Sequence, residues 1–273
     1  MKSWSFVALI KGGGDLGTGV AHRLHRAGMR VVVTELAQPL VIRRPVAFAS
    51  AVYEGTITVE GVVARRLPLD RAEIEAAWDR GEVPVLVDPE GLAVKVLRPN
   101  VVVDAILAKR NTGTRITDTP AVIALGPGFT AGVDCHAVIE TERGHYLGRV
   151  IWDGPARPDT GVPGVVGGQS ARRVLRAPAD GVFRGERRIG DLVREGETVA
   201  AVAGVPLVAP FDGVLRGLLR DGVAVRQGMK VGDVDPRGVP DYCFTISDKA
   251  RAVGGAVLEA ILTWLPVSGS VGE

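Results

Sequence analysis

Apolar residues in the first part of the chain occur in short runs that are separated by glycine turns and amphipathic stretches. Residues 6–11 form an apolar run that is followed by three glycines, which predicts a buried parallel strand. Residues 16–27 carry apolar side chains at helical spacing, and Gly28 ends this predicted helix. Residues 30–35 form a second, valine-rich strand, so the stretch has the order and length of a βαβ unit.

The same alternation continues to residue 152. Helical spacing predicts one helix over residues 71–80, and apolar runs predict further strands at residues 57–63, 83–87, 101–106, 121–125, 137–140 and 147–152. Alternating strands and helices are typical of the α/β class, so we expect a Rossmann-like, mainly parallel sheet domain over residues 1–152. Residues 153–173 are rich in proline and glycine, which predicts a linker or a draped loop.

The second part of the chain contains an internal repeat. The segment 177–182 (Ala-Pro-Ala-Asp-Gly-Val) recurs 32 residues later, at 209–214, as Ala-Pro-Phe-Asp-Gly-Val. Two glycines of each copy recur at the same offset. Two similar units of short strands and Asp-Gly turns predict a small β barrel or sandwich with pseudo-two-fold symmetry over residues 174–236. Residues 237–273 then hold a predicted C-terminal helix, residues 248–265, that packs on the body.

The turn after the first strand carries a glycine motif that is typical of nucleotide binding. Its glycines match G-x-G-x-x-G, where each glycine permits a tight turn or a close approach of the backbone to a phosphate. An acidic residue ends the second strand, where a carboxylate accepts a hydrogen bond from a ribose hydroxyl. The alternative is a vestigial loop in which the aspartate is a first-turn anion. The predicted contact residues are Gly12, Gly13, Gly14, Asp15, Leu16, Gly17 and Glu35.

Two further loops follow predicted strands. In a parallel sheet such loops converge on the edge that holds the glycine motif, and ligands bind at that edge. Their alternatives are a solvated basic loop and a tight turn. The predicted contact residues are Lys109, Arg110 and Asn111 in the first loop and Gly126, Gly128, Phe129 and Thr130 in the second.

One cluster has reactive side chains. Cys135 is next to His136, and His145 follows in the sequence. A thiol beside an imidazole can become a nucleophile, so these residues are weak catalytic candidates. Neighbouring residues on a strand point to opposite faces, and a lone cysteine is often a small buried apolar residue, which is the alternative. We expect no metal site.

The charge balance excludes two classes of partner. The chain has 33 Lys and Arg against 31 Asp and Glu, a net charge of +2. This balance lacks the large basic excess that is typical of proteins that bind nucleic acid or an anionic membrane. The apolar run at residues 4–10 is too short to span a membrane. Two cysteines cannot form a disulfide framework, which favours a reducing, cytoplasmic location. The sequence leaves open whether the protein forms a homo-oligomer.

Several motifs together resemble the YqeB family. They are the segments 10–21 (IKGGGDLGTGVA), 34–40 (TELAQPL), 43–48 (RRPVAF) and 125–132 (LGPGFTAG). The family comprises maturation proteins of the selenium-dependent molybdenum hydroxylase system. Residues 126–132, with residues 138–149, are also similar to the Rossmann part of XdhC-type proteins, which assist insertion or sulfuration of the molybdenum cofactor in xanthine dehydrogenase.

The repeat resembles the biotinyl and lipoyl carrier fold, which is a barrel-sandwich hybrid. Carriers present a Met-Lys pair on the hairpin before the second Ala-Pro, whereas this chain has Gly-Val-Pro-Leu-Val at residues 204–208. The pair Met229-Lys230 falls after the second copy. The resemblance therefore implies a structural module or a docking surface without a carrier lysine.

The resemblance to the YqeB family implies an accessory protein for a selenium-dependent molybdenum hydroxylase. It would bind NAD, molybdopterin cytosine dinucleotide or another nucleotide in its Rossmann domain. Its partners would be the hydroxylase apoenzyme or other cofactor-maturation proteins. Two alternatives are an NAD-dependent oxidoreductase and a non-catalytic scaffold that docks the target enzyme through the barrel module.

Overall fold

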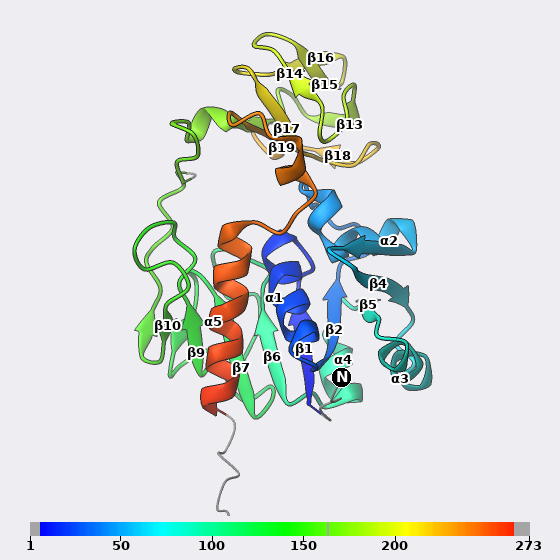
Figure 1. The fold of residues 1–273 in the computed structure, drawn as a ribbon, viewed down its shortest axis with the longest axis vertical. Helices are drawn as coiled ribbons and strands as arrows, with labels where there is room; N and C mark the ends of the chain where they lie inside the picture. Colours follow the sequence, from blue (N-terminus) through cyan, green and yellow to red (C-terminus); the bar gives the residue numbers. More distant parts are fainter. Residues whose placement is uncertain (1–5, 163, 265–273) are drawn as a thin grey trace, which may run out of the picture.

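A nine-stranded sheet forms the larger part of the protein, which the computed structural model describes for residues 6–162 and 164–264 (Figure 1). The strands, in their order across the sheet, are β10 (Val150–Ile151), β9 (Ala137–Ile139), β7 (Ala121–Leu125), β6 (Val101–Asp104), β1 (Val7–Lys11), β2 (Arg30–Glu35), β5 (Val83–Val87), β4 (Val62–Leu67) and β3 (Thr56–Val59). The strands from β9 to β4 run parallel, and the pairs β9–β10 and β3–β4 at the two edges are antiparallel.

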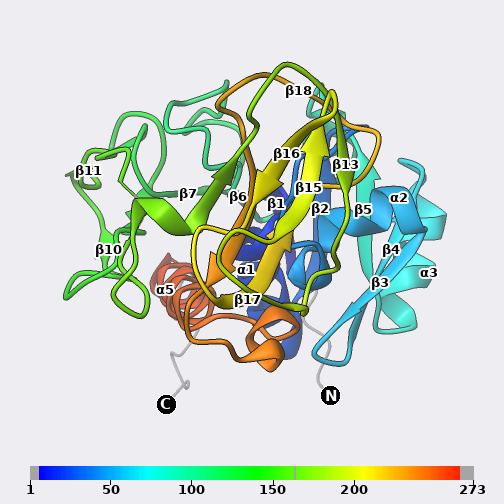
Figure 2. The ribbon, with the colours of Figure 1, turned by 90° about the horizontal axis from the view of Figure 1, so that it is seen from above.

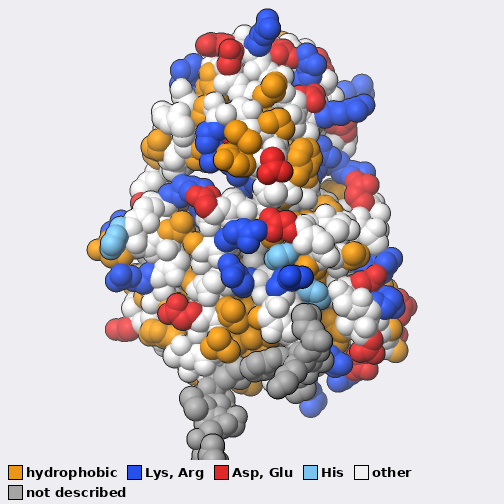
Figure 3. Space-filling view, in the orientation of Figure 1, with side chains coloured by type: hydrophobic (Ala, Val, Ile, Leu, Met, Phe, Trp, Pro, Cys, Tyr) orange, Lys and Arg blue, Asp and Glu red, His pale blue; other side chains and the backbone are white. Residues whose placement is uncertain are grey.

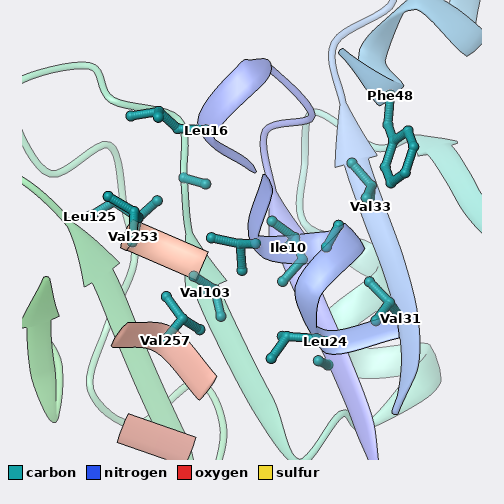
Figure 4. Close-up of a cluster of buried hydrophobic side chains, with 14 of the residues drawn as sticks. Ile10, Leu16, Leu24, Val31, Val33, Phe48, Val103, Leu125, Val253 and Val257 are labelled. Carbon is teal, nitrogen blue, oxygen red and sulfur yellow. The ribbon is translucent and has the colours of Figure 1, made fainter. Parts of the chain in front are cut away.

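Helices cover both faces of this sheet. The helices α1 (Asp15–Arg26) and α5 (Asp248–Trp264) pack on one face of the sheet. On this face, Ile10 and Val31 of the strands lie in the same core as Val253 and Val257 of α5 (Figure 4). The helices α3 (Arg71–Asp79) and α4 (Leu92–Leu97) contact the opposite face, where Leu9 is buried. Successive strand residues alternate between these two cores, as the pleat requires.

The second part of the chain forms a smaller unit, here called the β module. Its strands are β12 (Val174–Arg176), β13 (Gly181–Gly185), β14 (Leu192–Val193), β15 (Thr198–Val202), β16 (Val205–Val208), β17 (Gly213–Leu218), β18 (Ala224–Val225) and β19 (Lys230–Asp235). They form two four-stranded antiparallel sheets, in the orders β12-β19-β17-β14 and β16-β15-β13-β18, around a separate core.

The sequence repeat corresponds to a repeat of strands. β17, β18 and β19 each begin 32 residues after β13, β14 and β15, and each sheet contains strands of both halves. Shorter elements complete the chain: α2 (Ala51–Glu54), the strands β8 (Thr130–Ala131) and β11 (Gly154–Pro155), and four 3₁₀ turns, at Arg44–Val46, Phe48–Ser50, Ala171–Arg173 and Pro240–Cys243.

The predicted fold class, a mainly parallel Rossmann-like sheet with a barrel-sandwich hybrid module and a C-terminal helix, is wrong as stated. The large sheet is mixed, because a hairpin at Glu60 and Gly61 and a return after β9 add antiparallel strands at its edges. No helix follows β6 or β7 directly, since residues 105–120 lack helical spacing, and α5 from the end of the described chain lies on that face instead. The second part forms two separate antiparallel sheets and not one closed barrel.

The β module sits above the carboxyl ends of the parallel strands (Figures 1 and 2). Residues 39–46, here called the strap, leave the sheet after β2 and contact β17. The Leu218 amide donates to the Ile42 carbonyl at 2.8 Å, and Arg44 Nε donates to the Leu218 carbonyl at 2.8 Å. A side chain at Gly217 would lie 3.2 Å from the Ile42 carbonyl oxygen, so glycine permits this close approach.

Candidate functional site

A cleft of about 500 Å³ lies between the sheet and the β module. The sheet side contributes Asp15 and Leu16 from α1, Glu140 after β9 and Lys249 from α5. The module side contributes four charged residues: Arg173, Arg216, Lys230 and Asp233. In the space-filling view, the surface is hollowed between these two parts, and Lys and Arg side chains lie beside the hollow (Figure 3).

Two helices begin at this cleft. α1 starts at Asp15 and α5 starts at Asp248, and both run away from the β module (Figure 1). Gly14 is the N-cap of α1 and gives its amides no side-chain acceptor. A side chain at Gly14 would contact only Val41, at 3.9 Å, so the backbone there is open. Free amides and the positive end of a helix dipole favour an anion at such a place.

Cations outnumber carboxylates in the cleft. Eight lining residues are Lys or Arg: Arg43, Lys109, Arg143, Arg157, Arg173, Arg216, Lys230 and Lys249. Five are acidic: Asp15, Glu140, Glu142, Asp159 and Asp233. Each of the six cations other than Lys230 and Lys249 pairs with a carboxylate, at N···O distances between 2.7 and 3.8 Å. Within residues 6–162 and 164–264, the ammonium groups of these two lysines have no hydrogen-bond or ion-pair partner.

Three guanidinium groups also present unsatisfied donors. The Nε atoms of Arg43, Arg173 and Arg216 are buried, and each has no partner in the part of the chain that the structure describes. Arg216 is only 6% exposed, and its Nη1 atom is held by Asp235 at 2.8 Å. A buried donor without an acceptor costs about 1–3 kcal/mol.

Lys230 and Lys249 both lie near the start of α1. Desolvation by the surrounding protein lowers the pKa of each amine, although the Lys230 residue as a whole is exposed and Lys249 is half-buried. The Asp15 carboxylate raises the pKa of both, so the two amines and Asp15 share one neighbourhood. Lys249 also lies in the first turn of α5, where the helix dipole disfavours a cation. The Asp15 and Glu140 carboxylates act against this dipole effect at Lys249.

The glycine loop lies at the carboxyl end of β1, and Glu35 holds it. Glu35 Oε1 accepts a hydrogen bond from the Gly13 amide at 2.7 Å, and its Oε2 atom accepts from the Leu36 amide at 3.0 Å. Burial raises the pKa of Glu35. Gly12 and Gly17 pack on Ala105 and on each other. Of the residues predicted to contact a nucleotide in this loop, only Asp15 and Leu16 line the cleft. The Glu35 carboxylate points toward the loop and not into the cleft.

The other two predicted loops contribute less. Lys109 reaches the cleft, while Arg110 packs its backbone on Gly128 and Asn111 caps its own loop through Gly113 and Thr114. The remaining predicted residues have structural contacts: Gly126 against Thr141, Phe129 in an apolar core, and Thr130 bonded to Asp134.

The reactive cluster does not form. Cys135 is fully buried in an apolar core, and burial raises its pKa to about 12. His136 Nδ1 bonds to the Val122 amide at 2.9 Å, and its ring contacts Trp264. His145 is exposed beside Tyr146. These contacts give no support to a thiol–imidazole pair.

The most important cleft residues were absent from the predicted site. Arg216, Lys230 and Lys249 come from the module and from the last helix, far from any glycine loop in sequence. One signal was present, because a lysine in the first turn of a predicted helix is electrostatically unusual. The cleft also contains Arg43 and Arg143, which lie in or beside segments that carried the family resemblance.

The chain is similar to a bacterial protein of undescribed function. It is 53% identical over 256 residues to a protein named "Uncharacterized protein YqeB" from Escherichia coli (strain K12), and the match covers 94% of this chain. It covers 47% of the relative, so the chain spans about half the length of the curated relative that it matches. No family model matches the chain.

Solved structures give only distant matches. One is an aspartoacylase family protein from Mesorhizobium loti, with a TM-score of 0.28 and 10% identity, covering 85% of this chain and 86% of the other. Another is a succinylglutamate desuccinylase/aspartoacylase from Rhodobacter sphaeroides, with a TM-score of 0.27 and 15% identity, covering 85% of each chain. Similarities of this size do not establish a shared fold.

The predicted function is contradicted. The curated relative is described as uncharacterised, and its printed name gives no role in maturation. The proteins named above thus support neither a maturation role for a molybdenum hydroxylase nor an XdhC-like part. Glu35 bonds to its own loop, which removes the basis of the oxidoreductase alternative. The name of the curated relative gives no support to a scaffold that docks a target enzyme either.

Over residues 6–162 and 164–264, no helix combines the length and the apolar composition that crossing a bilayer needs.

Proposed function

We propose that the cleft binds a phosphorylated small molecule. One observation carries this proposal: the ammonium groups of Lys230 and Lys249 have no partner in residues 6–162 and 164–264, and both lie near the open start of α1. A phosphate group has the charge and the several acceptor oxygens that such a set of donors requires.

The charge of the cleft indicates the ligand's charge. After the six ion pairs are formed, Lys230 and Lys249 remain as cations without an ion pair, and the Glu140 carboxylate, which accepts from the amides of Glu142 and Arg157, remains as one unpaired anion, so the cleft keeps a positive charge. An anionic group would complement the two lysines. Phosphate monoesters and the diphosphate bridge of a dinucleotide are such anions near neutral pH.

Nucleotides belong to the same chemical class. NAD and molybdopterin cytosine dinucleotide, which the sequence suggested as cofactors, both contain a diphosphate group. Their binding is a proposal for this cleft, with the phosphates against the backbone at Asp15 and Leu16, the residues of α1 that line it. Glu35 would then act by fixing the loop and not by contacting a ribose.

Calorimetry with inorganic diphosphate tests the proposal. Lys230→Gln and Lys249→Gln each remove one unpaired cation, so the affinity is expected to fall at least ~tenfold, or about 1.4 kcal/mol. Lys95→Gln is the matched control, because Lys95 is exposed on α4 and does not line the cleft. Higher salt should weaken binding in the wild type. No diphosphate binding, or equal affinities in Lys249→Gln and Lys95→Gln, would contradict the proposal.

A further inference from the structure

A second cavity, of about 240 Å³, lies on the other side of the strap. Ile42 and Arg43 of the strap line the cleft, whereas Pro39, Val41 and Arg44 line this second cavity. Tyr53 of α2, Ile57 of β3 and Ile189 of the β module complete its walls. We call it the ring pocket, and it has no lining residue in common with the cleft.

The walls of the ring pocket are mainly apolar, and its aromatic side chain is held in place. The Tyr53 hydroxyl donates to the Pro39 carbonyl at 3.2 Å. The Arg220 guanidinium lies 4.5 Å from the centre of the Tyr53 ring and pairs with Glu54. Aromatic rings and guanidinium planes are the surfaces on which planar ligands stack. A fixed ring loses little freedom when a ligand packs against it.

Besides Tyr53, the polar lining residues of the pocket are Arg44, Ser50, Glu54 and Arg220, and Arg44 offers donors that are free to bind a ligand. Its Nε atom donates to the Leu218 carbonyl at 2.8 Å, which fixes the side chain. In the described part of the chain, its two terminal nitrogens have no hydrogen-bond partner. Burial lowers the pKa of Arg44, so the charge is held in a poorly solvated place. Small-molecule sites typically combine apolar walls with a few such convergent donors.

We propose that the ring pocket binds a nucleobase-like ring, planar and aromatic, with nitrogen or carbonyl acceptors along its edge. The apolar walls and Tyr53 contact the faces of the ring, and the terminal nitrogens of Arg44 donate to the acceptors. The cavity joins strap, sheet and β module, so a bound ring contacts both parts of the protein. This site stands on residues other than those of the proposed phosphate site.

Binding of uncharged nucleosides tests the ring pocket separately from the cleft. Adenosine, guanosine, cytidine and uridine have bases but no phosphate, so they probe the ring pocket alone. At least one is expected to bind the full chain, and Tyr53→Ala and Arg44→Gln should each weaken it at least ~tenfold. Lys249→Gln should leave it unchanged. Diphosphate affinity should be unchanged in Tyr53→Ala, which also shows that this variant is folded.

A second kind of variant covers the case in which these substitutions disturb folding. Ile57→Trp adds bulk from β3 without removing a polar contact, and it should block nucleoside binding while diphosphate still binds. The proposal is overturned if none of the four nucleosides binds the wild type. It is also overturned if binding falls in Lys249→Gln and persists in Tyr53→Ala, because the nucleoside would then lie in the cleft. Loss of diphosphate binding alone would overturn the phosphate site and leave the ring pocket standing.

Discussion

The Glu35 carboxylate accepts a hydrogen bond from the Gly13 amide at 2.7 Å, across the base of the glycine loop. Gly13 is buried, so water cannot replace this acceptor. The same carboxylate accepts from the Leu36 amide, and the loop is thereby held against the end of β2. The acidic residue at this position therefore stabilises the conformation of the glycine loop by hydrogen bonds to its backbone. The first turn of α1, which follows this loop, lies at the cleft.

Removing the carboxylate should destabilise the protein. Glu35→Ala leaves the buried Gly13 amide without an acceptor, so we expect the free energy of unfolding to fall by about 1–3 kcal/mol. Chemical denaturation measures this change. Glu90→Ala is the control, because Glu90 is exposed and makes no hydrogen bond within the described residues. Equal stability of the two variants would contradict the role given to Glu35.

The effect of Glu35→Ala should depend on pH. Burial raises the pKa of Glu35 above its ordinary value of 4.5, so the folded protein keeps this proton to a higher pH than the unfolded chain. The free energy of unfolding of the wild type therefore falls as the pH rises from 4.5 through the folded pKa. Glu35→Ala removes this term, and its destabilisation should be greater at about pH 4.5 than at about pH 7. The opposite trend would show that the pKa is lowered.

The contact between α1 and α5 depends on glycine at one position and not at the next. A side chain at Gly254 would lie 2.7 Å from the Gly19 carbonyl oxygen, whereas one at Gly255 would meet nothing within 4 Å. Gly254→Ala should therefore cost about 1–3 kcal/mol, because the helices must separate. Gly255→Ala should stabilise α5 by about 0.5–1 kcal/mol. Thermal unfolding of the two variants compares them directly, and the same sign for both would refute this packing.

The regular elements were readable where the local signal was strong. Residues 121–125 were predicted as a strand and form β7, because a continuous apolar run is bounded there by Pro120 and Gly126. Residues 57–63 were predicted as one strand but form a hairpin, which turns at Glu60 and Gly61 with positive φ at both. Glu-Gly is a weaker hairpin signal than Asn-Gly or Asp-Gly, so the turn was hidden by the apolar pattern around it.

The candidate site was less readable, because it is a tertiary arrangement. Asp15 lies in the motif that the sequence indicated, but the lysines near it, Lys230 and Lys249, are more than two hundred residues away along the chain. They reach Asp15 through the repeat of the β module and through the packing of α5 on α1. The direction of Glu35 was also hidden, since a carboxylate at the end of β2 can bond to a ligand or to its own loop.

Both cysteines should be inert in the folded protein. Cys135 and Cys243 are fully buried, and burial raises the pKa of both thiols, to about 12 for Cys135. The thiolate is the reactive form, so a disulfide reagent such as DTNB should label neither residue at about pH 8. In denaturant it should label two thiols per chain. Rapid labelling of Cys135 in the native protein would restore it as a catalytic candidate.

Anion binding in the cleft should weaken as the pH rises. Lys230 and Lys249 bind an anion only as ammonium groups, and their surroundings lower the pKa of each below 10.5. Binding is therefore lost as the pH passes through these lowered values, before ordinary surface lysines titrate. Sulfate is the suitable probe, because it stays a dianion from neutral pH to the pKa of lysine, whereas phosphate changes its own charge near neutral pH.

The affinity for sulfate should accordingly fall as the pH rises from neutrality toward 10.5, the ordinary pKa of lysine, and binding should take up protons where the amines begin to titrate. The uptake follows because a bound dianion favours the charged amine and raises its pKa. Calorimetry in two buffers of different ionisation enthalpy measures both quantities. Lys249→Gln should bind sulfate more weakly and show a smaller proton uptake, while Lys95→Gln should match the wild type. A sulfate affinity that stays constant over this range would mean that neither amine contacts the anion.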